Sequence, residues 1–190
     1  MKSRRTAPGA ILAAITLLAS GQTPAHAETG SHKFWSFITD TGSIIYLVAG
    51  TAMPLATDGH DGKAHTLRTV DSLLVSVGLS EAMKGIFNEQ RPDKSDHESF
   101  PSGHATAAFT VAAMESAFHP RQAALWYGGA ALIGASRVAL HRHYVHDVIM
   151  GALLGYGTAR LELSQRRGLI LAPFIPPTGN SLGLSLFGRF

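Results

Sequence analysis

The chain has 190 residues, of which 45% are hydrophobic and only 15% are charged. This length suggests one domain, and the apolar content excludes intrinsic disorder for most of the chain, because there is ample side chain to bury. The sequence contains no cysteine, which excludes disulfides, thiolate metal sites, iron–sulfur clusters and cysteine nucleophiles.

The first 27 residues have the layout of a secretory signal peptide. Three basic residues precede the apolar run 10–19 and the small-residue pattern Ala25-His26-Ala27, after which cleavage is expected. Removing residues 1–27 removes three of the 16 basic residues and no acid, which leaves 13 of each sign. The remaining net charge is zero, so nucleic-acid binding loses its main support. An uncleaved first helix is the alternative interpretation.

Five apolar segments follow and are predicted to be helices, from their length, alanine content and lack of strict alternation. They cover residues 34–56, 67–87, 105–118, 123–135 and 148–163. None clearly reaches the uncharged length of about 18 residues that is typical of a membrane span. The sequence therefore predicts an all-α fold, a compact bundle of five to six helices if the leader is counted. This bundle either touches a membrane or inserts into it with short spans.

Two loops, at residues 57–66 and 88–102, and a tail separate or follow these segments. The loop at residues 88–102 is long enough to suggest a function, because structureless loops of that length are uncommon inside compact domains. A helical domain is expected over residues 28–167 and a proline- and glycine-rich tail over residues 168–190. Leucines at every second position from 182 to 186 predict a short strand or hairpin in this tail. A frayed terminus is the alternative.

Charged and imidazole residues gather at the ends of the apolar segments, which places a candidate active site at the helix ends. They form three groups, Lys84-x6-Arg91-Pro92, Pro101-Ser102-Gly103-His104 and Ser136-Arg137-x5-His143-x3-Asp147. The short spacings within each group bring charged or imidazole residues close together along the chain.

The cations and the predicted helix start together suit a multiply charged oxyanion. Arginine presents a planar fork of donors that matches phosphate oxygens, and lysine supplies a compact charge. Ser102 and Gly103 come just before a predicted helix, whose first N–H groups bind anions. Glycine permits close approach of the backbone, and the serine hydroxyl can donate a further hydrogen bond.

His143, Asp147 and His104 have the side chains that a phosphohistidine mechanism uses. His143 and Asp147 are four residues apart, so on a helix they would share one face. A carboxylate bonded to one ring nitrogen leaves the other nitrogen free to attack. His104 can then donate a proton to the leaving group. These roles predict a phosphatase that uses no metal and no other cofactor.

The three groups, in this order and with these spacings, resemble the three sequence motifs of the type 2 phosphatidic acid phosphatase superfamily. The resemblance spans about residues 67–160. It implies that His143 is the nucleophile, that Asp147 orients it and that His104 protonates the leaving group. It also implies which residues hold the phosphate, namely Lys84, Arg91, Ser102, Gly103 and Arg137. Membrane members of the family have six spanning helices, a number that the six segments match.

The expected function is hydrolysis of lipid-linked phosphate monoesters or pyrophosphates on the periplasmic side of a bacterial inner membrane. Candidate substrates are phosphatidic acid, phosphatidylglycerophosphate, an isoprenyl pyrophosphate and a lipid A phosphate. The expected partners are such a lipid and the membrane surface or bilayer, with no nucleic acid and no protein partner. A soluble broad-specificity periplasmic acid phosphatase and a vanadium-dependent haloperoxidase are the alternatives.

A zinc site is a further interpretation of the third group. Its ligands would be His141, His143, His146 and Asp147. The neighbouring cations disfavour a metal there, and no clean pair of ligands at positions i and i+4 stands beside a third ligand elsewhere. His141 and His146 are therefore expected to be surface or packing residues.

Overall fold

The computed structural model describes residues 25–165, 168–169, 171–174 and 183–186. Most of the predicted leader lies outside the described residues, so its cleavage stays a prediction. The chain divides after Lys33 into two units, and the second, Phe34–Phe190, contains every helix that begins after residue 37.

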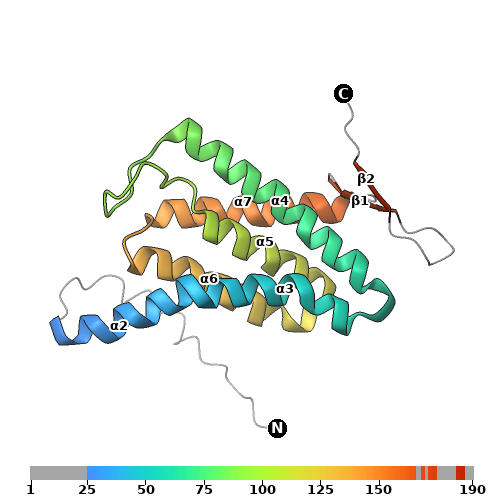
Figure 1. The fold of residues 1–190 in the computed structure, drawn as a ribbon, viewed down its shortest axis with the longest axis horizontal. Coiled ribbons are helices and arrows are strands. Elements are labelled where there is room, and N and C mark those ends of the chain that lie inside the picture. The colour runs from blue at the N-terminus through green and yellow to red at the C-terminus, as the bar shows by residue number, and fades with distance from the viewer. Residues whose placement is uncertain (1–24, 166–167, 170, 175–182, 187–190) are drawn as a thin grey trace, which may run out of the picture. The chain divides into compact units, whose positions relative to one another are not determined.

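Helices make up most of the described chain (Figure 1). The α-helices are α2 (Ala25–Phe37), α3 (Ser43–Thr57), α4 (Gly62–Phe87), α5 (Gly103–Phe118), α6 (Ala123–Ala139) and α7 (Val145–Ser164). A π-helical turn, η1 (Ile38–Gly42), joins α2 to α3, and the short 3-10 turns are η2 (Gly59–Asp61) and η3 (Pro120–Gln122). The predicted all-α class is confirmed.

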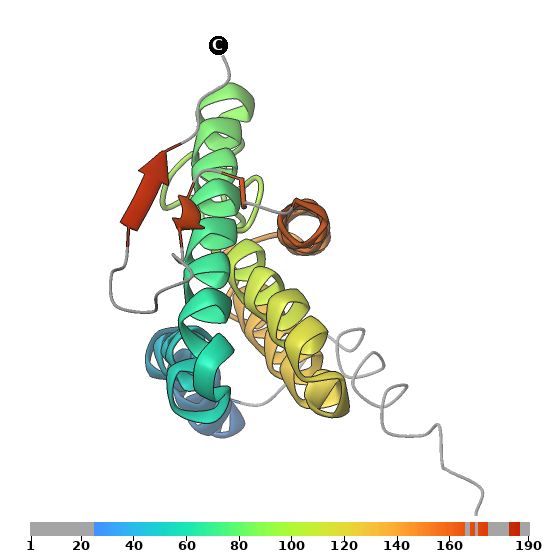
Figure 2. The same ribbon diagram turned by 90° about the vertical axis from the view of Figure 1, so that its right-hand side faces the viewer.

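The tail contains the short β segment that alternating leucines predict. Strand β2 (Gly183–Leu186) pairs antiparallel with β1 (Leu171–Phe174). Strand β1 packs against α4, and Figure 2 shows the two red strands beside that green helix.

The expected loop at residues 57–66 is wrong, because α4 already begins at Gly62. The turn from α3 is tight: Gly59 has a φ of +54°, which favours glycine. A Cβ on Gly62 would collide with the carbonyl of Pro54, so the start of α4 lies directly on the end of α3. This close approach replaces most of the expected loop with helix.

Helix α5 lies at the centre and packs against α3, α4, α6 and α7. Its threonines and most of its alanines are buried, and Trp126 of α6 packs beside them with its ring 5.4 Å from that of Tyr46. Trp126 is therefore a core residue. None of the described helices contains an apolar stretch long enough to cross a membrane.

Two glycines let α7 approach α5 closely. A Cβ on Gly151 would lie 2.6 Å from the carbonyl oxygen of Ser102. A Cβ on Gly155 would collide with the carbonyl of Thr106 and would lie 2.9 Å from the backbone nitrogen of Thr110. Since the obstacles are backbone atoms, no side-chain rotation can relieve them. This contact fixes the first turns of both helices beside each other.

We expect Gly155→Ala to destabilise the protein by about 1–3 kcal/mol, because the added methyl overpacks the contact between the two helices. Gly157→Ala is the matched control, since a Cβ at that position of the same helix meets nothing within 4 Å. Alanine should there be neutral or stabilising by up to about 1 kcal/mol. Denaturant unfolding of both variants measures the difference. Equal stabilities would show that the helices do not approach this closely.

Candidate active site

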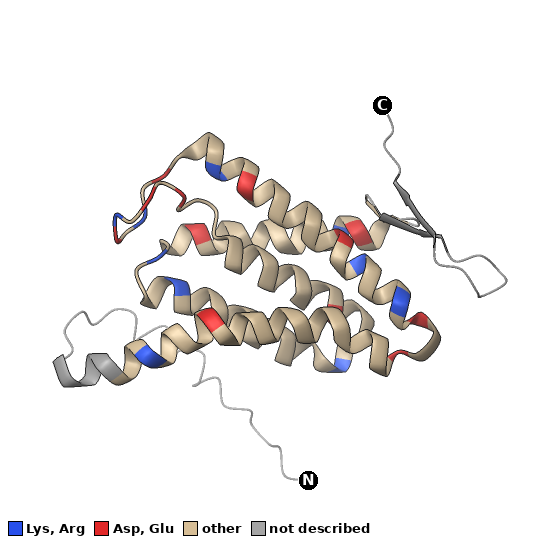
Figure 3. Ribbon diagram, in the orientation of Figure 1, with Lys and Arg blue, Asp and Glu red and all other residues tan. Residues whose placement is uncertain are grey.

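The ends of four helices meet on one side of the bundle. The ends of α4 and α6 and the starts of α5 and α7 lie together there, with the loop 88–102 beside them (Figure 1). Figure 3 shows that charged residues gather in this loop and near the helix ends, while the middle turns are mostly uncharged. The predicted site residues all belong to these ends and their connections, namely Lys84, Arg91, Ser102, Gly103, His104, Arg137, His143 and Asp147.

Asp147 joins the start of α7 to the chain that precedes α5. Its side chain is fully buried, and its Oδ2 accepts hydrogen bonds from the Ser99 hydroxyl at 2.5 Å and from the Tyr144 N–H at 2.8 Å. Its backbone carbonyl accepts from the Ser102 N–H at 3.0 Å. Residues that are 45 or more positions apart in sequence are thus held together by one aspartate. Ser99 belongs to none of the three sequence groups, so the sequence analysis did not predict its role.

His143 lies in the turn between α6 and α7, because α7 begins only at Val145. The expectation that His143 and Asp147 share a helix face is therefore wrong. The Nδ1 atom of His143 lies 2.7 Å from the carbonyl oxygen of Ser99 and 3.6 Å from Oδ2 of Asp147. A carbonyl only accepts, so Nδ1 carries the proton and Nε2 keeps its lone pair. Asp147 positions this ring mainly through Ser99.

The cations of the site are concentrated around the two histidines. Burial and then the positive charges of Arg137 and Lys84 lower the pKa of His104 to about 4. Burial and then Arg137 also lower the pKa of His143 below its ordinary value. Desolvation and a surplus of positive charge together keep both rings neutral. A dianion between them would relieve that repulsion and favour protonation of His104.

The surroundings of Arg137 indicate a binding site for an anion. The residue is buried, and its Nε atom has no hydrogen-bond partner among the described residues. Burial, Arg91 and Arg142 lower the pKa of this guanidinium to about 10. A buried cation surrounded by like charge is costly unless an anion compensates it. The site is therefore built to receive negative charge.

Lys84 extends this cationic region over the start of α5. Its Nζ would lie 3.5 Å from a Cβ on Gly103, which is ordinary van der Waals contact, so the amine lies directly beside the start of α5. Lys84 also forms an ion pair with Glu81, whose carboxylate lies 2.7 Å from the amine. The sequence analysis did not identify Glu81 as a site residue.

Ser102 is the N-cap of α5, and its buried hydroxyl accepts a hydrogen bond from the Ala105 N–H at 3.5 Å. Its first structural role is therefore to cap the helix.

Arg91 and Asp40 approach the same region from other elements. The Arg91 Nε donates to Asp96 at 2.6 Å, which fixes the guanidinium within the loop. Asp40 belongs to η1, which is anchored by a 2.6 Å hydrogen bond between the hydroxyls of Thr39 and Ser136. Its negative charge acts on His104 and opposes the effect of the cations there. Asp40 had no distinguishing pattern in the sequence.

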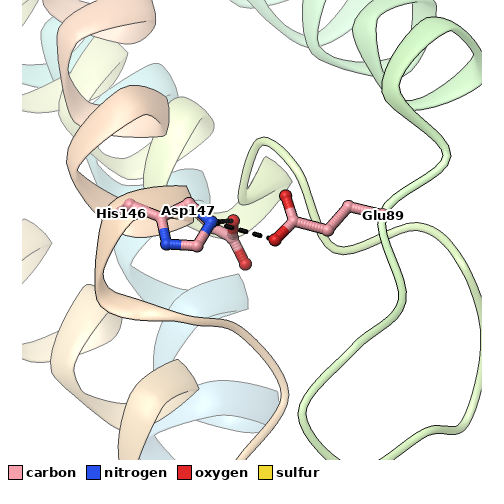
Figure 4. Close-up of side chains that lie close together, drawn as sticks. All are labelled: Glu89, His146 and Asp147. Atoms are coloured by element: carbon pink, nitrogen blue, oxygen red, sulfur yellow. Dashed lines mark hydrogen bonds and ion pairs between the residues drawn. The ribbon is translucent and has the colours of Figure 1, made fainter.

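One group of side chains at the edge of the site has metal-ligand chemistry. Glu89, His146 and Asp147 each offer one ligand atom, and these atoms lie within 4.8 Å of one another (Figure 4). This set differs from the zinc ligands considered from the sequence. His143 directs its Nδ1 to Ser99, and His141 is exposed.

Comparisons with known proteins agree with this architecture. The sequence profile described as the PAP2 superfamily matches residues 66–170. A lipid A 1-phosphatase of Porphyromonas gingivalis is 30% identical over 142 residues, which are 67% of this chain and 30% of that relative. The crystal structure of LpxE from Aquifex aeolicus superposes with a TM-score of 0.64 and 23% identity, covering 81% of this chain and 94% of that one.

We expect Arg137→Ala to weaken the binding of orthovanadate, a phosphate analogue, by about 10–100-fold, because hydrogen bonds to charged groups contribute about 1.5–3 kcal/mol. Arg121→Ala is the control, since Arg121 is an exposed arginine at the other end of α6. Arg137→Lys should bind orthovanadate with intermediate affinity, because lysine keeps the positive charge but lacks the planar pair of N–H donors of the guanidinium group. Isothermal titration calorimetry measures all three variants. Unchanged affinity in Arg137→Ala would place the anion elsewhere.

Proposed function

Because this chain belongs to the PAP2 superfamily, we propose that it is a phosphatase that hydrolyses lipid-linked phosphate esters through a phosphohistidine intermediate. The observation that carries the proposal is the environment of His143. Its Nδ1 is bound to a carbonyl, so the lone pair on Nε2 is available for attack, and the buried Arg137, whose Nε has no hydrogen-bond partner among the described residues, lies nearby. A nucleophile beside an anion site is the arrangement that phosphoryl transfer needs.

Binding comes first in the proposed reaction. The guanidinium groups of Arg137 and Arg91 and the amine of Lys84 contact the phosphate oxygens, together with the N–H groups at the start of α5. The bound dianion offsets the positive charge around His104 and raises its pKa from about 4. His104 then carries the proton that the leaving oxygen requires.

The chemistry then proceeds in two steps. The Nε2 lone pair of His143 forms a bond to phosphorus while the bond from phosphorus to the ester oxygen breaks, and His104 gives its proton to that oxygen. The Ser99 carbonyl and the Asp147 carboxylate stabilise the positive charge that develops on the ring. In the second step neutral His104 takes a proton from water, and the water oxygen displaces His143 from phosphorus. Inorganic phosphate then leaves.

The lipid nature of the substrate is supported by the surface around the helix ends. Large apolar side chains are exposed on the last turn of α4 and on the first turns of α7, including Ile86, Phe87, Val145 and Ile149. Ile86 is 76% exposed. Acyl chains would cover such a surface, whereas a small soluble ester would not. The relative from Porphyromonas gingivalis is a lipid A 1-phosphatase, which makes a phosphorylated glycolipid a suitable first substrate to test.

The same surface supports a location at the cell envelope. An exported chain would meet lipid phosphates at the periplasmic face of the inner membrane, where the exposed apolar residues contact the bilayer. The predicted leader agrees with this location.

We expect His143→Ala to abolish the phosphoenzyme with both lipid phosphates and nitrophenyl phosphate, because no covalent intermediate can form. His104→Ala should slow lipid-phosphate hydrolysis by about 10²–10⁴-fold, the usual contribution of a positioned acid. It should slow phosphoenzyme formation from nitrophenyl phosphate much less, since nitrophenolate leaves without a proton. Rapid-quench detection of acid-labile phosphoenzyme measures both effects.

His97→Ala is the control for these variants, because His97 is an exposed histidine of the loop 88–102. It should behave as the unchanged protein with both substrates. A phosphoenzyme that persists in His143→Ala, or one that is lost only in His104→Ala, would contradict the assignment of the nucleophile. Oxidation of halide with vanadate and peroxide, without phosphate release, would contradict the proposed function itself.

A further inference from the structure

His146 lies between two carboxylates at the edge of the proposed catalytic site. Its Nε2 atom is 3.0 Å from Oε1 of Glu89 and 3.0 Å from Oδ1 of Asp147 (Figure 4). Glu89 comes from the loop after α4, whereas His146 and Asp147 belong to the first turn of α7. The three side chains therefore converge from two separate segments. The proposed phosphatase reaction uses neither Glu89 nor His146.

The spacing of the three ligand atoms suits a small divalent cation. Zinc binds imidazole nitrogen and carboxylate oxygen at about 2.0–2.2 Å. Bonds of that length place neighbouring ligand atoms about 3 Å apart for right-angled coordination, and about 3.4 Å apart for tetrahedral coordination. The two nitrogen–oxygen distances in this cluster are 3.0 Å. The two carboxylate oxygens lie within 4.8 Å of each other, so the Glu89 side chain has to turn inward to complete either geometry.

A second observation points into the same space. The Asp147 side chain is fully buried, and its Oδ1 atom accepts no hydrogen bond within the described part of the chain. Its other oxygen, Oδ2, is already bound by Ser99 and Tyr144. Buried carboxylate oxygens normally have a donor or a cation as partner. Oδ1 is directed at the ring nitrogen of His146, where an ion would sit.

Access and charge also favour a cation at this position. The side chain of His146 is 58% exposed, so an ion can enter from solvent. The loop arginines do not oppose it strongly, because Arg91 is paired with Asp96 and Arg142 with Asp93. Two carboxylates and one neutral imidazole neutralise a doubly charged ion, and their mixed oxygen and nitrogen chemistry favours a borderline ion over magnesium.

We propose that Glu89, His146 and Asp147 form a regulatory site for a borderline divalent cation such as Zn²⁺, and that its occupation lowers the activity of the neighbouring catalytic site. The ion binds Nε2 of His146 together with Oε1 of Glu89 and Oδ1 of Asp147. Asp147 lies 3.6 Å from the His143 ring, so a bound dication cancels the negative charge that stabilises that ring during phosphoryl transfer. The inhibitory effect rests on the proposed function, while the binding of the ion does not.

Direct binding tests the site without any enzymatic readout. Zn²⁺ is titrated calorimetrically into the untagged full chain in phosphate-free buffer, with excess Mg²⁺ present to occupy weak carboxylate sites. We expect one Zn²⁺ per chain, and an affinity reduced at least about tenfold in Glu89→Gln and in His146→Asn. His60→Asn is the matched control, because His60 is an exposed histidine 3.3 Å from Asp61 at a distant turn. Its affinity should remain unchanged.

Thermal unfolding of each variant verifies that the fold is retained. Zn²⁺ should also slow nitrophenyl phosphate hydrolysis by the unchanged protein and by His60→Asn, and a chelator should restore the rate. Glu89→Gln should resist this inhibition at the same Zn²⁺ concentration. Binding by Glu89→Gln and His146→Asn equal to that of the unchanged protein would overturn the site, whether or not the chain is a phosphatase. Stoichiometric binding without any change in rate would overturn the inhibitory role.

Discussion

The buried carboxylate of Asp147 is the contact on which the arrangement of the site depends. Through Oδ2 it binds the Ser99 hydroxyl and the Tyr144 N–H, and through its carbonyl it binds the Ser102 N–H. The carbonyl of Ser99 in turn fixes the ring of His143. One residue thus sets the start of α7, the approach to α5 and the orientation of the proposed nucleophile. The close packing of α5 on α7 through glycine makes this geometry rigid.

The electrostatics of the site oppose stability and favour binding of an anion. Arg137 is buried, its Nε has no hydrogen-bond partner in the described part of the chain, and burial together with neighbouring arginines lowers its pKa to about 10. Desolvation and the positive charges of Arg137 and Lys84 likewise lower the pKa of His104 to about 4. A protein that only had to fold would gain from removing such charges. Their retention around a histidine with a free Nε2 is explained by a substrate that carries negative charge to them.

The sequence predicted those features that depend on local spacing, and it failed where distant segments meet. The helices were found because apolar runs of sufficient length predict them, and the site residues lie at the helix ends as their positions indicated. The role of Ser99 could not be predicted, since its carbonyl and its hydroxyl bind residues that are 44 and 48 positions away. The position of His143 before the start of α7 was not predicted. A spacing of four residues between His143 and Asp147 fits a helix as well as it fits a turn followed by a helix start. The tight turn at Gly62 depends on contact with Pro54, which no periodicity reveals.

A double-mutant cycle on Ser99 and Asp147 tests this account most directly. Ser99→Ala removes the hydroxyl and keeps the carbonyl on His143, whereas Asp147→Asn removes the charge. Because Asp147 positions the ring mainly through Ser99, the rate of phosphoenzyme formation in the double variant should equal that of the slower single variant. Losses that multiply in the double variant would contradict the account, because the two residues would then act on His143 independently.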